Sequence, residues 1–179
     1  MKVLGISGSL RRDSYNTALL FNAPLELELW DGLKAIPPYD EDDDVEPAPP
    51  AVAQMRAAVA GADAILFATP EYNASVPGQL KNAIDWLSRP HATSVLRNKP
   101  VAVVGASIGA FGAVWAQAEL RKVLATAGAR VIEGDVAVGH AHERFDSNGV
   151  LTDESLLGQL HEVVDALVAE VATREQIAA

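Results

Sequence analysis

The residues best suited to chemistry form a short polar run near the N-terminus of the chain. The run follows an apolar stretch, Val3–Ile6, and leads into a helical pattern that begins at Tyr15; its polar members are Ser7, Ser9, Arg11, Ser14, Asn16 and Thr17. A strand, a polar turn and a helix N-terminus together bind anions, because unpaired N–H groups and the helix dipole point at the ligand. These hydroxyl, amide and guanidinium donors predict a site for a terminal phosphate group.

The same run lacks the glycine spacing of two widespread nucleotide-binding loops. It contains neither Gly-x-x-x-x-Gly-Lys-Ser/Thr, the loop of nucleotide triphosphatases, nor Gly-x-Gly-x-x-Gly, the dinucleotide-binding fingerprint. A hydroxyl-rich loop after the first strand, without those glycines, is the way a flavodoxin-like fold holds the phosphate of FMN. The alternative is a polar strand-to-helix loop with an incidental arginine.

The composition limits the classes of protein that this chain can be. Its 179 residues, 49% of them hydrophobic, fit one globular domain over residues 1–179. The chain has no cysteine, which excludes disulfides and thiol catalysis. A net charge of −10 makes nucleic acid and anionic membranes poor partners. Because the sequence shows no signal peptide and no apolar run of membrane length, we expect a cytoplasmic protein.

Two clusters of potential metal ligands have simpler interpretations. Six of the seven residues from Asp40 to Glu46 are acidic, and prolines bracket the run. Such a run favours a solvated, self-repelling loop over a metal site. His140 and His142 lie two residues apart with no third ligand close by in the sequence, which favours the surface end of a strand. We therefore expect no metal centre.

Apolar runs alternate with helical patterns along the chain, which is typical of a parallel sheet with helices on both faces. We expect five strands, near Val3–Ile6, Leu25–Leu29, Ala64–Ala68, Val101–Ala106 and Val131–Val138. The third and fourth are uninterrupted apolar runs, as central strands covered on both faces should be. The last helix carries an apolar stripe from Leu156 to Val171.

Three loops leave the carboxyl ends of these strands, where ligands bind in a doubly wound sheet. They cover Ser7–Asn16, Thr69–Gly78 and Gly105–Gly112. In the second loop, Tyr72 offers a ring face and Asn73 offers both a donor and an acceptor. The first loop supplies phosphate donors and the third a glycine-rich backbone. Together they predict a flat aromatic ligand that carries a phosphate.

With these loops in this order, the chain resembles the NAD(P)H-dependent FMN reductases. The likeness rests on Ser7–Arg11 with Ser14 and Asn16, Pro70–Asn73, Val76–Gly78, Leu80–Trp86, Ser107–Gly109, Phe111–Gly112, and Phe145–Asp146 with Gly149–Thr152. The resemblance implies a flavodoxin-like α/β fold, a three-layer sandwich around a five-stranded parallel sheet of order 2-1-3-4-5 with helices on both faces. It also implies non-covalent FMN, hydride from NADPH or NADH, and small acceptors such as flavins, quinones, azo dyes or metal oxyanions. Members of the family are usually homodimers or homotetramers.

The resemblance further implies a role for individual residues. The FMN phosphate would be held by Ser9, Arg11, Ser14, Asn16 and Thr17, and the ring system would be lined by Pro70, Glu71, Tyr72 and Asn73, with Ser107 closing the site. No catalytic side chain is implied, because the cofactor carries the chemistry. The run Gly112–Trp115 departs from the Gly–Ala–Arg of many relatives, which affects the acceptor pocket and the subunit contacts.

Two other functions are compatible with parts of the sequence. Gly105-x-Ser107-x-Gly109 matches the nucleophile elbow of a serine hydrolase, with His140, His142 or His161 as a base. That hypothesis leaves the loops at Arg11 and Tyr72 unexplained. The second alternative is a non-enzymatic electron carrier of the flavodoxin type, whose acidic surface would dock on a basic partner.

One residue suggests how the chain could assemble. In the helix over Gln79–Ser88, Trp86 falls off the apolar stripe, on the face that a monomer would leave wet. Large aromatic side chains in such positions are enriched at interfaces. We therefore expect a homodimer or larger assembly with the flavin site near the subunit contact. The alternative is that another segment of the same chain covers Trp86.

Overall fold

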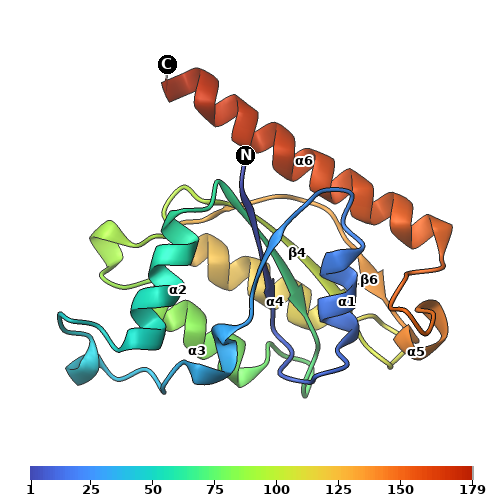
Figure 1. Cartoon of the computed structure of the whole chain (residues 1–179), viewed down its shortest axis with the longest axis horizontal. Helices are drawn as coiled ribbons and strands as arrows, with labels where there is room; N and C mark the ends of the chain where they lie inside the picture. The colour runs from blue at the N-terminus through green and yellow to red at the C-terminus, as the bar shows by residue number, and fades with distance from the viewer. Residues whose placement is uncertain (179) are drawn as a thin grey trace.

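The computed structural model describes residues 1–178, and its centre is a parallel sheet (Figure 1). The strands are β1 (Val3–Ser7), β2 (Glu28–Trp30), β3 (Ala64–Thr69), β4 (Pro100–Ala106), β5 (Arg130–Val131) and β6 (Ala137–Val138). They lie in the order β2-β1-β3-β4-β5, each pairing between them is parallel, and β6 also pairs with β4. The predicted order 2-1-3-4-5 is confirmed.

Helices cover both faces of the sheet and make two separate cores. On one face lie α1 (Tyr15–Phe21) and α6 (Glu154–Ala178), and on the other lie α2 (Pro50–Ala60), α3 (Gly78–Leu87) and α4 (Val114–Thr126). The residues of β3 alternate between the cores, as the period of a strand requires: Ile65 and Phe67 face α2–α4, and Leu66 faces α1 and α6. A short helix, α5 (Ala141–Arg144), follows β6.

Two of the predicted strands differ from the structure. The fifth, Val131–Val138, is interrupted, and the second, Leu25–Leu29, is shifted along the chain. The chain pairs with β4 twice, through β5 and then through β6, and leaves the sheet between them. Gly134 in this gap has a φ of 137°, and Arg121 of α4 donates to the carbonyls of Val103 and Gly134. The arginine supplies donors where a continuous strand would have supplied N–H groups. The second strand is β2, which begins later than predicted.

Trp86 is buried, so the argument from this residue for an assembly is wrong. Its side chain has no exposed surface, and its Nε1 donates to the carbonyl of Pro37 at 2.9 Å. Tyr39 packs against the indole ring edge to face, with the ring centroids 5.0 Å apart. The guanidinium of Arg56 lies 5.8 Å from the ring centroid on the indole face. The segment after β2 therefore covers Trp86 within one chain, and this residue provides no argument for an assembly.

The acidic run after β2 forms an exposed loop with a short 3-10 helix, Glu41–Asp43, and the prediction of a solvated loop is confirmed for most of it. Asp44 differs, because its carboxylate forms a largely buried ion pair with Arg56 at 2.9 Å. Within the described residues, no group of three or more His, Asp or Glu side chains is arranged to hold a metal ion. None of the helices over residues 1–178 is long and apolar enough to cross a membrane.

Candidate active site

The loop after β1 ends at a capped helix N-terminus. Ser14 is the N-cap of α1, and its Oγ accepts from the backbone N–H groups of Asn16 and Thr17 at 3.2 and 3.3 Å. Serine is favoured at this position because its hydroxyl pairs with N–H groups that have no partner inside the helix. The positive end of the α1 dipole therefore points toward the carboxyl edge of the sheet, at the lower side of Figure 1.

Asn16 holds this helix against the neighbouring strand. Its Oδ1 accepts from the N–H of Ala106 and its Nδ2 donates to the carbonyl of Ala106, both at 2.9 Å. The side chain is 3% exposed, so both polar atoms are used in a buried bridge from α1 to the end of β4. Thr17 likewise donates its hydroxyl to Ser7 Oγ at 3.0 Å. Asn16 and Thr17, both predicted to contact the phosphate, thus use their side chains to hold α1 to the ends of β4 and β1.

The loop after β3 is a tight turn between two prolines. Tyr72 and Ser75 exchange two backbone hydrogen bonds of 3.1 Å, and Asn73 and Ala74 between them have φ values of 55° and 59°. Two successive left-handed residues make a type I′ turn, a conformation that asparagine accepts more readily than most residues. The turn leaves the ring of Tyr72 half exposed beside the sheet edge.

Two carboxylates fasten this turn to α4. Glu71 Oε2 accepts from the N–H groups of Trp115 and Ala116 at 3.0 and 3.1 Å, and so caps a helix whose own N-cap residue makes no side-chain hydrogen bond. Glu119 Oε2 accepts from Ser75 Oγ at 2.6 Å and from Val76 N–H at 3.3 Å. The pKa of Glu119 is lowered below its ordinary value mainly by the hydrogen bond from Ser75 and, to a smaller extent, by that from Val76.

The loop after β4 turns sharply at Ser107. The N–H of Ser107 donates to the Val138 carbonyl at 3.0 Å, and its Oγ accepts from Gly109 N–H at 3.1 Å. In the described part of the chain, no histidine is hydrogen-bonded to the Ser107 hydroxyl, so the base that a serine hydrolase requires is not in place. Gly112 has a φ of 58°, and a Cβ there would lie 2.3 Å from the Ala137 carbonyl carbon.

These three loops enclose one cleft of about 300 Å³ at the carboxyl edge of the sheet. It is lined by Ser9, Arg11, Ser14, Tyr15, Asn16, Pro70, Glu71, Tyr72, Ala106, Ser107 and Ile108. Eight of the ten residues predicted for the site are in this set. Asn73 lies outside it, and Thr17 lines a neighbouring groove beside α1, together with Arg12. The two consecutive arginines, Arg11 and Arg12, therefore line different hollows.

Three lining residues were not predicted. Ala106 and Ile108 flank Ser107, and their place at the end of a strand could have indicated them. Tyr15 gave no such signal, because the first residue of a helical stripe is usually part of the core. Its ring packs against the core on the α1 and α6 face and stacks on Phe145, with the centroids 5.5 Å apart.

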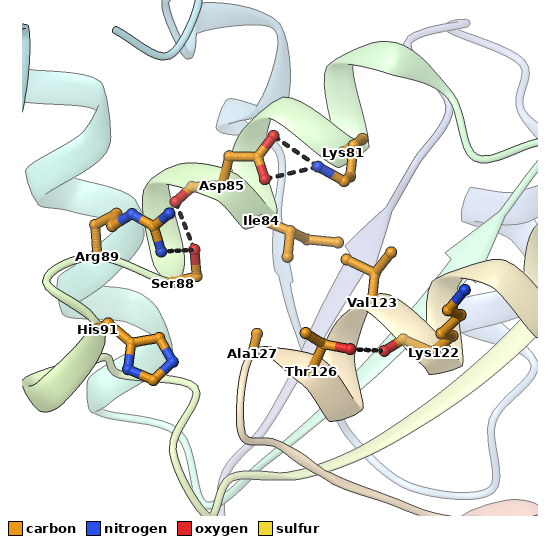
Figure 2. Close-up of a pocket in the computed structure, with 10 residues that line it drawn as sticks. All are labelled: Lys81, Ile84, Asp85, Ser88, Arg89, His91, Lys122, Val123, Thr126 and Ala127. Atoms are coloured by element: carbon orange, nitrogen blue, oxygen red, sulfur yellow. Dashed lines mark hydrogen bonds and ion pairs between the residues drawn. The ribbon is translucent and has the colours of Figure 1, made fainter. Parts of the chain in front are cut away.

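A further cavity lies elsewhere, between α3 and α4 (Figure 2). It has a volume of about 300 Å³ and is lined by Ile84, Val123 and Ala127 with several cationic side chains at its rim. Figure 2 shows Lys81 paired with Asp85 of the same helix, at 2.7 Å. None of the residues predicted for the site lines this cavity.

A parallel sheet of this order, with a capped phosphate-type loop after β1 and a cleft at the carboxyl edge, defines a flavodoxin-like protein. A family model described as NADPH-dependent FMN reductase matches residues 1–143. The chain belongs to this family, as its motifs indicated.

Individual proteins are similar over nearly the whole length. An NAD(P)H-dependent FMN reductase of Pseudomonas aeruginosa is 43% identical over 174 residues, which is 93% of each chain. A 2-hydroxy-1,4-benzoquinone reductase of a Burkholderia species is 37% identical over 97% of this chain and 98% of its own. Among solved structures, the flavoenzyme NAD(P)H:(acceptor) oxidoreductase FerB of Paracoccus denitrificans matches with a TM-score of 0.82 and 35% identity, covering 96% of this chain and 97% of its own.

Proposed function

We propose that this chain takes hydride from NADH or NADPH and reduces quinones and similar small acceptors through FMN held non-covalently in the cleft. The observation that carries the proposal is the convergence of three loops on one cleft. One loop offers the donors of a phosphate site, and the other two offer a half-exposed aromatic ring and backbone amides. This is the donor set that a phosphorylated, planar heterocycle requires.

The residues present fit FMN at both ends of the cleft. Ser9 and Arg11 line it at the N-terminus of α1, where the helix dipole favours a phosphate. Glu71 is a lining carboxylate that could repel an anion, but its Oε2 is engaged by two backbone N–H groups of α4. Ser14 and Asn16 hold the phosphate loop in shape, while Tyr72, Pro70 and Ser107 line the ring end.

FMN supplies the redox chemistry when it is bound, and the chain supplies binding, orientation and electrostatics. The bonds from Asn16 to β4, from Glu71 to the N-terminus of α4, and from the Tyr72 turn to Glu119 of α4 hold the walls of the cleft before any ligand enters. Asn73, at the tip of this turn, lies outside the cleft lining, and its contact with the flavin ring stays a prediction. No general base from the chain is needed.

The similar proteins support quinones as acceptors, since several are named quinone reductases. A homodimer or homotetramer and a cytoplasmic location stay predictions. The assembly prediction now rests on the resemblance to the family, since Trp86 is buried.

The decisive experiment is steady-state turnover by the purified protein. Oxidation of NADPH or NADH with 1,4-naphthoquinone should require FMN and follow ping-pong kinetics. A protein that binds FMN yet fails to oxidise NADPH and NADH with any acceptor would be the electron carrier instead. Ser107→Ala should retain turnover, because no nucleophile is needed. Loss of all activity in this variant with FMN still bound would reopen the hydrolase hypothesis.

A further inference from the structure

A band of exposed apolar side chains adjoins the cleft on its Tyr72 side. Tyr72, Ile108, Phe111 and Trp115 are 50%, 63%, 64% and 49% exposed. We call these four residues the aromatic rim. Tyr72 and Ile108 line the cleft directly, and Phe111 and Trp115 follow in the same loop and in the first turn of α4. Exposed large apolar side chains that gather at a site indicate binding.

Phe111 and Trp115 form an ordered pair at the outer part of this rim. Their ring centroids are 5.0 Å apart and the rings are inclined by 64°, an edge-to-face contact. The N–H of Val114 donates to the Phe111 carbonyl at 3.2 Å and closes the turn between the two residues. An edge-to-face pair leaves ring faces open to a further planar group.

The pair is fixed relative to the cleft by contacts of the backbone. Glu71, which lines the cleft, accepts from the N–H of Trp115 itself. Gly112 and Ala113 have φ values of 58° and 62°, and Gly112 packs directly on the backbone of Ala137. A left-handed pair of residues backed by a strand turns the chain sharply and sets where Trp115 emerges. The backbone positions of Phe111 and Trp115 are therefore fixed beside the cleft.

We propose that Phe111 and Trp115 determine acceptor specificity by favouring quinones with two or more fused rings. The quinone ring of such an acceptor is reduced in the cleft, and its outer ring stacks on the aromatic pair. This inference rests on the proposed function and goes beyond it, since it names the acceptor class and the residues that select it. On this proposal a single-ring quinone has no second ring with which to contact the pair. Continuity of the rim with the cleft, through Tyr72 and Ile108, is the observation that favours a substrate over another occupant.

The reaction balances without a further reagent. NADPH or NADH loses a hydride, the quinone gains that hydride's two electrons and one proton, and a proton from water completes the hydroquinone. Two ferricyanide ions accept the same two electrons one at a time and need no stacking surface, and the proton of the hydride is released to water. Ferricyanide therefore reports on hydride uptake and FMN binding independently of the aromatic rim.

The test compares kcat/KM for 1,4-naphthoquinone, 1,4-benzoquinone and ferricyanide in holoprotein of the wild type, Trp115→Ala and Phe111→Ala. We expect each variant to lose about threefold to tenfold with naphthoquinone, the scale of one aromatic stacking contact, and to change little with the other two acceptors. Trp115→Phe should recover most of the loss, because it keeps a ring. Phe21→Ala, which removes an equally exposed phenyl ring at the far end of α1, is the matched control.

Several outcomes would overturn the inference. Equal losses with all three acceptors would show that Trp115 acts on hydride uptake or on FMN binding. A change of molecular mass in light scattering of Trp115→Ala would show that a second copy covers the rim. Unchanged naphthoquinone kinetics in both alanine variants would exclude stacking. If the wild type reduces none of the three acceptors, the proposed function fails first, and that result is distinguishable from the others.

Discussion

Arg11→Ala is the most direct test of the phosphate end of the cleft. The side chain of Arg11 lines the cleft with Ser9 and Ser14, whereas Arg12 lines the groove on the other side of the loop. A hydrogen bond to a charged group contributes about 1.5–3 kcal/mol. Because Arg11 is exposed to solvent, we expect the lower value, which corresponds to about tenfold weaker FMN binding.

The assay is titration of apoprotein with FMN and with riboflavin, in which binding is monitored by flavin fluorescence. Riboflavin lacks the phosphate, so Arg11→Ala should leave its affinity unchanged while it lowers that for FMN. Arg12→Ala controls for the loss of one positive charge from the same loop. Equal losses in the two variants would show that the loop provides only diffuse charge, and an equal loss of riboflavin affinity would place Arg11 at the ring instead.

Three other variants test the parts that hold the cleft. Asn16→Ala leaves the buried N–H and carbonyl of Ala106 without partners, so chemical denaturation should show a loss of about 1–3 kcal/mol in the free energy of unfolding for each group left unpaired. Trp86→Ala removes a fully buried indole and should lower that free energy by about 3–5 kcal/mol without dissociating any assembly. Glu119→Gln should lower stability only at higher pH. The pKa of Glu119 is lowered in the folded state, so the ionised carboxylate stabilises the fold above its ordinary pKa of 4.5, and this stabilisation is lost as the pH falls below that value. Thermal unfolding of the wild type and of Glu119→Gln across this pH range should show their difference in stability disappear at low pH.

The strands and most of the cleft could be predicted because they follow from local patterns, and the order of the strands followed from the resemblance to the family. Apolar runs identified the strands, and the rule that ligands bind at the carboxyl ends of parallel strands brought three loops together. Neither step requires knowledge of side-chain packing. Eight of ten predicted residues therefore line the cleft, although the chain separates the first and third loops by about ninety positions.

Two of the errors, on Trp86 and on the fifth strand, involve contacts between different segments. The helical stripe of α3 describes the face toward the sheet, but the segment around Pro37 that covers Trp86 lies 49 positions away and has no periodic signal. The run Val131–Val138 is apolar enough for one strand, and the break depends on a guanidinium supplied by α4. Residue type alone cannot say which of several distant partners a side chain will choose.

The polar residues of the motifs divide into two kinds, which the sequence cannot separate. Ser9, Arg11 and Tyr72 line the cleft, where a ligand can reach them, whereas Asn16 and Glu71 also have side-chain atoms bonded to the backbone of β4 and α4. Both kinds of residue would be needed for function, but for different reasons. Loss of a residue that faces the ligand weakens binding and leaves the fold intact, while loss of an anchor displaces a loop and lowers stability together with affinity. Measuring both quantities for each variant would therefore assign every motif residue to one kind or the other.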